Sequence, residues 1–173
     1  MKILLASLMC LVLGASECFA IKGGPWGRGS GSLIGTYAGV MQGDVASNAL
    51  GIFTIGVPQT GLSSGLFIIF QSGLLLNGTM QAVADGNRRK ITGLLHAEAT
   101  QIRLIDGEIT TTIVGVADGQ LVANVQNSSN FSSGRLLAGT AFVNLHDQPA
   151  PIPDTNETYQ ISGFQQSASP PSS

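Results

Sequence analysis

The chain has 173 residues, only 10% of them charged, and a net charge of −2 at pH 7. Nucleic-acid-binding domains are usually strongly basic, so no nucleic-acid partner is expected. Both cysteines, Cys10 and Cys18, fall within the first twenty residues, which excludes disulfides, thiol catalysis and cysteine-ligated metals from the rest of the chain.

The chain begins with the pattern of a secretory signal. Residues 1–20 combine the basic Lys2, an apolar stretch from Ile3 to Leu13 and the small residue Ala20. We expect cleavage near Ala20 and a protein that is secreted or held in the periplasm or cell envelope. An exported domain without disulfides favours a bacterial origin. No apolar stretch reaches the roughly 20 residues of a membrane-spanning helix, so no transmembrane helix is predicted.

One β domain is predicted over residues 33–165. A glycine-rich segment at 21–32 should be a flexible leader, and the polar, proline-bearing segment at 166–173 a disordered tail. Between them, runs of aliphatic, aromatic and β-branched residues alternate with Gly, Asn, Asp and Pro, which is typical of strands and turns. The predicted strands are Ser32–Gln42, Leu50–Val57, Gly65–Gln71, Leu74–Asp85, Arg88–Glu98, Gln101–Val116, Gln120–Gln126, Arg135–His146 and Thr158–Phe164.

These eight or nine strands have mostly short connections, which join antiparallel neighbours. We therefore expect an all-β, single-domain antiparallel meander that closes into an up-and-down β-barrel, with a β-sandwich as the alternative. Closure is favoured because it removes exposed edges. Three longer loops, at residues 43–49, 127–134 and 147–157, are the expected places for partner contacts.

Turn signals divide the chain further. The sequence Val-Ala-Asp-Gly occurs at 83–86 and again at 116–119, and both copies are predicted turns because Asp-Gly tolerates positive φ. The apolar face also slips between Leu104 and Ile109, on either side of Asp106-Gly107-Glu108. This slip predicts a β-bulge or a break into two strands.

Three consecutive basic residues, Arg88, Arg89 and Lys90, follow the first of these turns. Alternation along the strand places Arg89 with Ile91 and Leu95 on the core face, and Lys90 with Glu98 on the solvent face. We interpret the triplet as the solvated end of a hairpin that discourages edge pairing, with an anion site as the less favoured alternative.

Few residues could carry chemistry. The strand-turn-helix context of a G-x-S-x-G nucleophile elbow is missing, and neither catalytic residues nor a cofactor are predicted. No metal site is predicted either; the nearest candidates are His96 and Glu98, two apart on one strand face, with His146 and Asp147 as further ligand sources. The aspartates at 85, 118 and 147–154 are interpreted as turn formers in preference to calcium ligands.

The expected function is a non-catalytic one: an exported binding or structural module with a protein or small apolar ligand as partner. The first alternative is a carrier of lipocalin-like architecture whose interior, lined by Phe53, Ile55, Met80 and Leu95, holds an apolar molecule. The second is a small outer-membrane barrel, suggested by the apolar run Leu66–Phe70. We interpret that run instead as a strand in the most covered part of the sheet.

Overall fold

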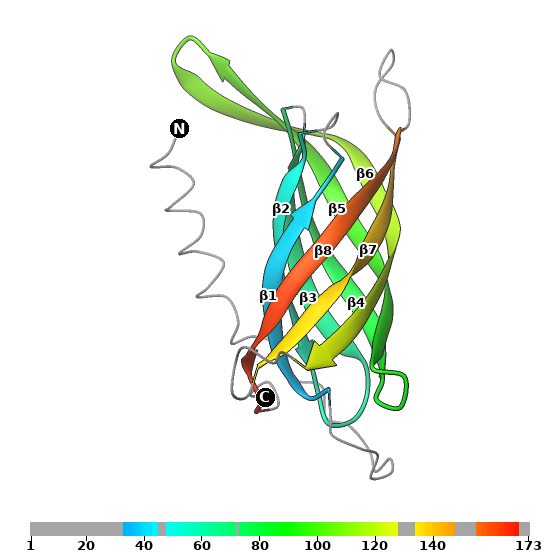
Figure 1. The fold of residues 1–173 in the computed structure, drawn as a ribbon. Helices are drawn as coiled ribbons and strands as arrows, with labels where there is room; N and C mark the ends of the chain where they lie inside the picture. Colours follow the sequence, from blue (N-terminus) through cyan, green and yellow to red (C-terminus); the bar gives the residue numbers. More distant parts are fainter. Residues whose placement is uncertain (1–32, 45–47, 72, 128–133, 148–154, 170–173) are drawn as a thin grey trace.

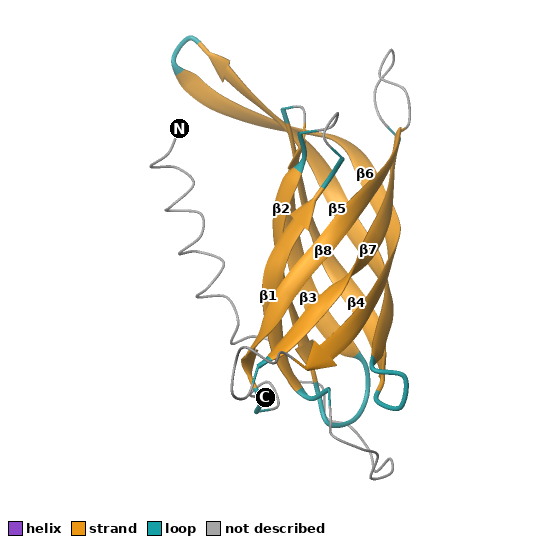
Figure 2. Ribbon diagram, viewed as in Figure 1, coloured by secondary structure: helices purple, strands orange, loops and turns teal. Residues whose placement is uncertain are grey.

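Eight antiparallel strands form a closed barrel. The computed structural model describes residues 33–44, 48–71, 73–127, 134–147 and 155–169. The strands are β1 (Gly35–Gln42), β2 (Leu50–Val57), β3 (Ser63–Gln71), β4 (Leu74–Asp85), β5 (Lys90–Ile105), β6 (Glu108–Asn127), β7 (Arg135–His146) and β8 (Thr155–Ser167). Each strand pairs with the next along the chain, and β8 pairs with β1 (Figures 1 and 2). The predicted all-β, up-and-down barrel is confirmed, and the sandwich is not formed.

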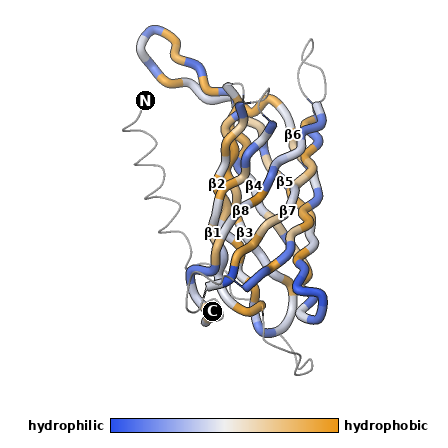
Figure 3. Tube along the Cα trace, in the orientation of Figure 1, coloured by the Kyte–Doolittle hydropathy of each residue, from blue (hydrophilic) through white to orange (hydrophobic). Residues whose placement is uncertain are grey.

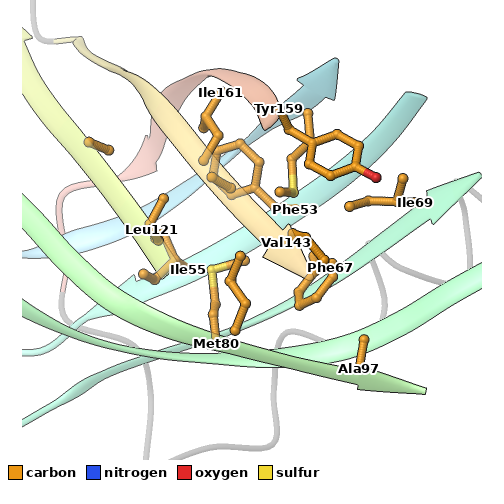
Figure 4. Close-up of a cluster of buried hydrophobic side chains, with 14 of the residues drawn as sticks. Phe53, Ile55, Phe67, Ile69, Met80, Ala97, Leu121, Val143, Tyr159 and Ile161 are labelled. Atoms are coloured by element: carbon orange, nitrogen blue, oxygen red, sulfur yellow. The ribbon is translucent and has the colours of Figure 1, made fainter. Parts of the chain in front are cut away.

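The barrel interior holds the hydrophobic core. Along each strand, apolar side chains at alternate positions point inward, as Figure 4 shows for residues of several strands. Tyr37 and Tyr159 lie inside towards opposite ends of the barrel, and both are fully buried. The Tyr37 hydroxyl donates to the Leu33 carbonyl at 3.0 Å, and the Tyr159 hydroxyl donates to Gln71 Oε1 at 2.6 Å. Burial raises the pKa of both phenols, so both remain neutral donors.

Glycine occupies an inward-facing position in every strand. At Gly39 a Cβ would lie 2.1 Å from the Ser162 carbonyl oxygen, and at Gly139 it would lie 2.1 Å from the Val122 carbonyl oxygen. The same close approach of the neighbouring strand's backbone occurs at Gly51, Gly65, Gly78, Gly93, Gly119 and Gly163. Because no side chain fits there, these positions let the sheet bend tightly enough to close.

Strand boundaries confirm part of the sequence analysis. The predicted bounds of Leu50–Val57, Leu74–Asp85 and Arg135–His146 are those of β2, β4 and β7. β8 is longer than predicted at both ends, and β1 begins at Gly35 instead of Ser32. The predicted signal, the leader at 21–32 and most of the loops at 127–134 and 147–157 lie outside the described residues.

The predicted strand Gln101–Val116 is wrong as a single element and is instead the tip of a hairpin. Asp106 and Gly107, at φ 51° and 85°, form a two-residue turn between β5 and β6. Positive φ at both positions is the conformation that Asp-Gly suits. A register shift beside Ala99 adds one residue, Val114, to β6. The slip in the apolar face therefore marks both a turn and a bulge.

The second Val-Ala-Asp-Gly is not a turn. Residues 116–119 lie inside β6 and pair with β5 on one side and β7 on the other. Pairing on both edges outweighs the local turn preference of Asp118-Gly119. The first copy behaves as predicted, since β4 ends at Asp85 and β5 begins at Lys90.

The basic triplet lies at that turn. Asp85 Oδ1 accepts hydrogen bonds from the backbone N–H groups of Asn87 and Arg88, at 3.0 and 3.2 Å. Arg89 adopts φ 51° within the turn and is exposed, so its predicted place on the core face is wrong. From Ile91 onward the predicted alternation is confirmed, with Ile91 and Leu95 buried and Glu98 exposed.

Candidate functional site

Two histidines and two aspartates meet on the outer surface of the barrel. His96 on β5 and Asp118 on β6 are register partners, and His146 ends β7 beside them. His96 Nδ1 lies 2.7 Å from Asp118 Oδ1, His146 Nε2 lies 2.9 Å from Asp118 Oδ2, and His146 Nδ1 lies 3.0 Å from Asp147 Oδ2. We call these four residues the His–Asp cluster.

The cluster favours a charged imidazole. A carboxylate only accepts hydrogen bonds, and both ring nitrogens of His146 face carboxylates, so His146 donates to both only when it is protonated. Asp118 first and Asp147 second raise the pKa of His146 above its ordinary 6.5. In turn His96 and His146 lower the pKa of Asp118 below its ordinary 3.8. The cluster therefore stabilises the protonated form of His146 on the outer surface of the barrel.

The structure brings only part of the suggested metal ligand set together. Glu98 shares the outward face of His96 but lies opposite Val116, outside the chain of contacts that joins the His–Asp cluster. Among the described residues, no group of three or more His, Cys, Asp or Glu side chains is arranged to hold a metal ion. The aspartate at 154 lies outside the described residues.

The four residues suggested to line a ligand site all point into the barrel. Ile55, Met80 and Leu95 belong to one interior row, in which Gly65 lies between Ile55 and Met80. A Cβ on Gly65 would lie 2.8 Å from Met80 Cγ, so the Met80 side chain occupies the space over this glycine. The ring of Phe53 likewise reaches across to Gly163 on β8. All four side chains are buried in one core cluster, in which Figure 4 labels Phe53, Ile55 and Met80.

Comparison with protein-family models, curated proteins and solved structures finds no match for this chain.

An apolar surface covers the outside of the first strands. The outward residues of this surface, which we call the apolar wall, are Val40, Leu50, Ile52, Leu66, Ile68, Phe70 and Leu75. Leu66 and Ile68 are half-buried and Phe70 is exposed. β2 and β3 each have a single exposed residue, the fewest of the eight strands, so Leu66–Phe70 does lie in the more covered part of the sheet, with its outer face partly exposed. Strands β1, β2 and β3 contain no Asp, Glu, Lys or Arg, which leaves this side of the barrel uncharged.

A two-stranded arm extends from the end of the barrel. β4 pairs with β5 only as far as Gln101, and β7 pairs with β6 only from Val116 onward. Residues 102–113, which we call the arm, therefore have strand neighbours within the described chain only in each other (Figure 1). A two-stranded hairpin is at best marginally stable in water by itself. Packing against another surface would therefore stabilise the arm.

One face of the arm is apolar and exposed. Register pairs share a face, which places Leu104 with Ile109, and Ile102 with Thr111, on the side that also bears Ile113. The side chains of Leu104, Ile109 and Ile113 are 73%, 65% and 61% exposed. The opposite face carries Arg103 and Thr110, whose hydroxyl donates to the Arg103 carbonyl at 3.3 Å. Figure 3 shows polar and apolar residues alternating along the arm.

The arm and the apolar wall are continuous. A single outward row of register partners runs from Leu50 through Phe70, Leu75 and Thr100 to Ile113, at the base of the arm. Elsewhere, exposed apolar residues form smaller groups. Phe142 lies between Gln120 and Thr158, and Leu94 lies between Gln81 and Gln120. Leu136 and Phe164 form a single exposed pair. The wall and the arm are thus the extended apolar surface of the described barrel.

Sequence analysis touched on this surface only through the outer-membrane alternative, which the run Leu66–Phe70 suggested. The run Leu66–Phe70 is apolar at every position. This pattern indicates a strand with apolar side chains on both faces. In a closed barrel one of those faces must be the outer one. Sequence analysis named His96, His146 and Asp147 as possible ligands but grouped His96 with Glu98 and took Asp118 for a turn residue. The grouping was missed because the members come from different strands and meet only through the register.

Proposed function

We propose that this protein is an exported, non-catalytic β-barrel that acts by binding a protein partner on its outer surface. The observation that carries the proposal is the continuous apolar surface formed by the wall and the arm. Contiguous exposed apolar surface of this kind marks interaction sites in folded proteins. The signal pattern at residues 1–20 supports placing the protein in the cell envelope or outside the cell.

The residue chemistry supports binding over catalysis. The His–Asp cluster is solvent-exposed on the outer surface of β5, β6 and β7, where the side chains of His96 and Asp118 are 65% and 53% exposed. Enzymes instead place their acid and base groups in clefts where water is excluded and fields are strong. The packed interior supplies a rigid support, which is what a binding surface on strands requires.

Carriage of a small apolar molecule is a second candidate, favoured by an interior that is apolar along its length. The same side chains that would line such a site fill it: Phe53, Met80 and Leu95 all belong to the buried core cluster. To hold a small molecule in the interior, the protein would have to move these side chains aside. Native mass spectrometry of the exported protein tests this: a retained small molecule would favour carriage over outer-surface binding.

Site-directed photocrosslinking tests the leading proposal. A benzophenone side chain placed at Ile109 lies on the apolar face of the arm, and one placed at Thr110 lies on the opposite face of the same strand. We expect a discrete crosslinked product from position 109 in the exporting cells, and a much weaker one from position 110. Equal products from both positions, or none from position 109, would contradict the proposal.

A further inference from the structure

Half of the asparagines of the chain begin an acceptor pattern for N-linked glycans. Four of the eight are followed by x-Ser or x-Thr with no proline between, at residues 77–79, 127–129, 130–132 and 156–158. The signal pattern at residues 1–20 would bring these sites into a secretory pathway, where such asparagines are modified. The patterns at 77–79 and 156–158 lie wholly within the described residues, so the fold decides whether a glycan fits there.

We propose that Asn77 and Asn156 carry N-linked glycans on the outer surface of the barrel. The donor is an oligosaccharide linked to a polyprenyl pyrophosphate, and an oligosaccharyl transferase of the secretory pathway transfers it. The asparagine Nδ2 forms a bond to C1 of the first sugar, and the bond from C1 to the pyrophosphate oxygen breaks. The polyprenyl pyrophosphate leaves, and one amide proton passes to a base of the transferase. This inference does not rest on the proposed binding function.

Both acceptor sites face outward with their two recognition residues. Residues i and i+2 of a strand share a face, so Thr79 accompanies Asn77 on the outside of β4, and Thr158 accompanies Asn156 on the outside of β8. All four residues are exposed, whereas Gly78 between the first two is buried. A shift of either strand by one residue would turn its asparagine into the core. In the observed register a glycan at either position displaces no core side chain.

The neighbours of Asn77 favour a sugar at this position. Ile68 on β3 is its register partner and Leu75 precedes it by two residues, so both apolar side chains share its outer face. Both are half-buried. The C–H groups on one side of a sugar ring can cover these side chains, which removes apolar area from water. The glycan would therefore cover the β4 border of the apolar wall.

The hydrogen bond made by Asn156 is compatible with the modification. Asn144 Nδ2 donates to Asn156 Oδ1 at 2.8 Å. A glycosylated asparagine keeps its amide oxygen as an acceptor, because the sugar replaces a hydrogen on the nitrogen only. The contact with Asn144 therefore persists after modification and helps to orient the amide.

The acceptor sites leave most of the proposed binding surface open. β1, β2, β3 and the arm contain no asparagine, and the described acceptor asparagines lie on β4, β6 and β8. Glycans are bulky and solubilising, so they would keep other proteins away from these strands. Such a modification belongs to a eukaryotic secretory pathway, in contrast to the bacterial origin that the lack of disulfides favours.

Peptide mass spectrometry of the exported protein, recovered from the cells that make it, tests the proposal. A peptide-N-glycosidase acting in H₂¹⁸O converts each glycosylated asparagine into an ¹⁸O-labelled aspartate. We expect label at Asn77 and Asn156, and none at Asn124, an exposed asparagine of β6 outside any acceptor pattern. A sample incubated without the enzyme corrects for spontaneous deamidation, to which Asn77-Gly78 is prone. The absence of enzyme-dependent label at either Asn77 or Asn156 would overturn the proposal.

The matched variants are Thr79→Ala and Thr79→Ser. Thr79→Ala removes the acceptor pattern but keeps Asn77, so the label at Asn77 should be lost while the label at Asn156 remains. Thr79→Ser keeps the pattern and should keep both labels. Circular dichroism establishes that both variants retain the barrel. Enzyme-dependent label at Asn77 that persists in Thr79→Ala would overturn the proposal, and the crosslinking test of outer-surface binding would be unaffected.

Discussion

Gly139 illustrates at the scale of one residue how the barrel closes. A Cβ at this position would lie 2.1 Å from the Val122 carbonyl oxygen and 2.5 Å from Ala123 Cα, both backbone atoms of the paired strand. Because backbone yields less easily than a flexible side chain, we expect Gly139→Ala to lower the free energy of unfolding by about 1–3 kcal/mol. Urea unfolding measures the change. Ala138→Ser, at the exposed position next to it, is the control, and equal stability of the two variants would contradict the close-packing argument.

Asp118 gives a pH-dependent prediction. Because the pKa of Asp118 is lowered in the folded protein, its carboxylate stabilises the fold at pH values above its ordinary pKa of 3.8. This stabilisation is lost as the pH falls through the folded-state pKa. Because the pKa of His146 is raised in the folded protein, its protonated ring stabilises the fold fully below pH 6.5. This stabilisation is lost as the pH rises through the folded-state pKa. The cluster thus contributes most between these two values, and Asp118→Asn should lose more stability at pH 5 than at pH 8.5. The same variant should lower the pKa of His146, measured by NMR titration. Glu98→Gln, on the same outward face, should leave that pKa unchanged.

Ser63 gives a prediction of opposite sign. Its side chain is fully buried inside the barrel, and its hydroxyl has no hydrogen-bond partner among the described residues. Because an unpaired buried hydroxyl costs roughly 1–3 kcal/mol, Ser63→Ala should raise the free energy of unfolding by about 1 kcal/mol. Thermal unfolding compared with Ser64→Ala, at the half-buried neighbouring position, checks this; a destabilised Ser63→Ala protein would mean that the hydroxyl is paired.

At the scale of elements, the β4–β5 hairpin contains both buried core residues and exposed residues at its turn. Leu95 is buried opposite Met80, so Leu95→Ala should cost about 2–5 kcal/mol. The ion pair between Arg88 and Asp85, at 3.6 Å, joins exposed side chains and is worth little. Replacing Arg88 and Lys90 by serine should therefore change stability by no more than about 0.5 kcal/mol. Urea unfolding decides the matter, and a double-serine variant less stable than Leu95→Ala would reverse the assignment of the two faces.

The strands also show what the sequence could and could not predict. Alternation of apolar and polar residues placed β2, β4 and β7 correctly, because these strands are bounded by turn residues on both sides. The dipeptide Asp-Gly is a turn at Asp106 but lies within β6 at Asp118. Local propensity is the same at both places, and only pairing with β5 and β7 distinguishes them. The His–Asp cluster depends on the register of β5, β6 and β7, which no local pattern specifies.

At the scale of the whole molecule, export should leave the barrel intact. The small residue Ala20 ends the signal pattern, and the first described strand begins at Gly35. We expect the mature chain to begin at Ile21, as measured by intact mass and N-terminal sequencing of the exported form. An exported protein that retains Met1 would contradict this prediction.

Closure is the property that makes the eight strands one unit. β8 pairs with β1 on one side and β7 on the other, and it contributes Tyr159 and Ile161 to the core. A chain that ends at residue 154 would open two edges and expose the interior, a loss comparable with the roughly 5–15 kcal/mol that stabilises a typical domain. We therefore expect it to lose cooperative urea unfolding and to aggregate. A chain that ends at Ser169 keeps every β8 residue and should unfold like the full protein. If the shorter chain unfolded at the same urea concentration, the barrel would not depend on the β1–β8 seam, and stability would have to reside in β1–β7 alone.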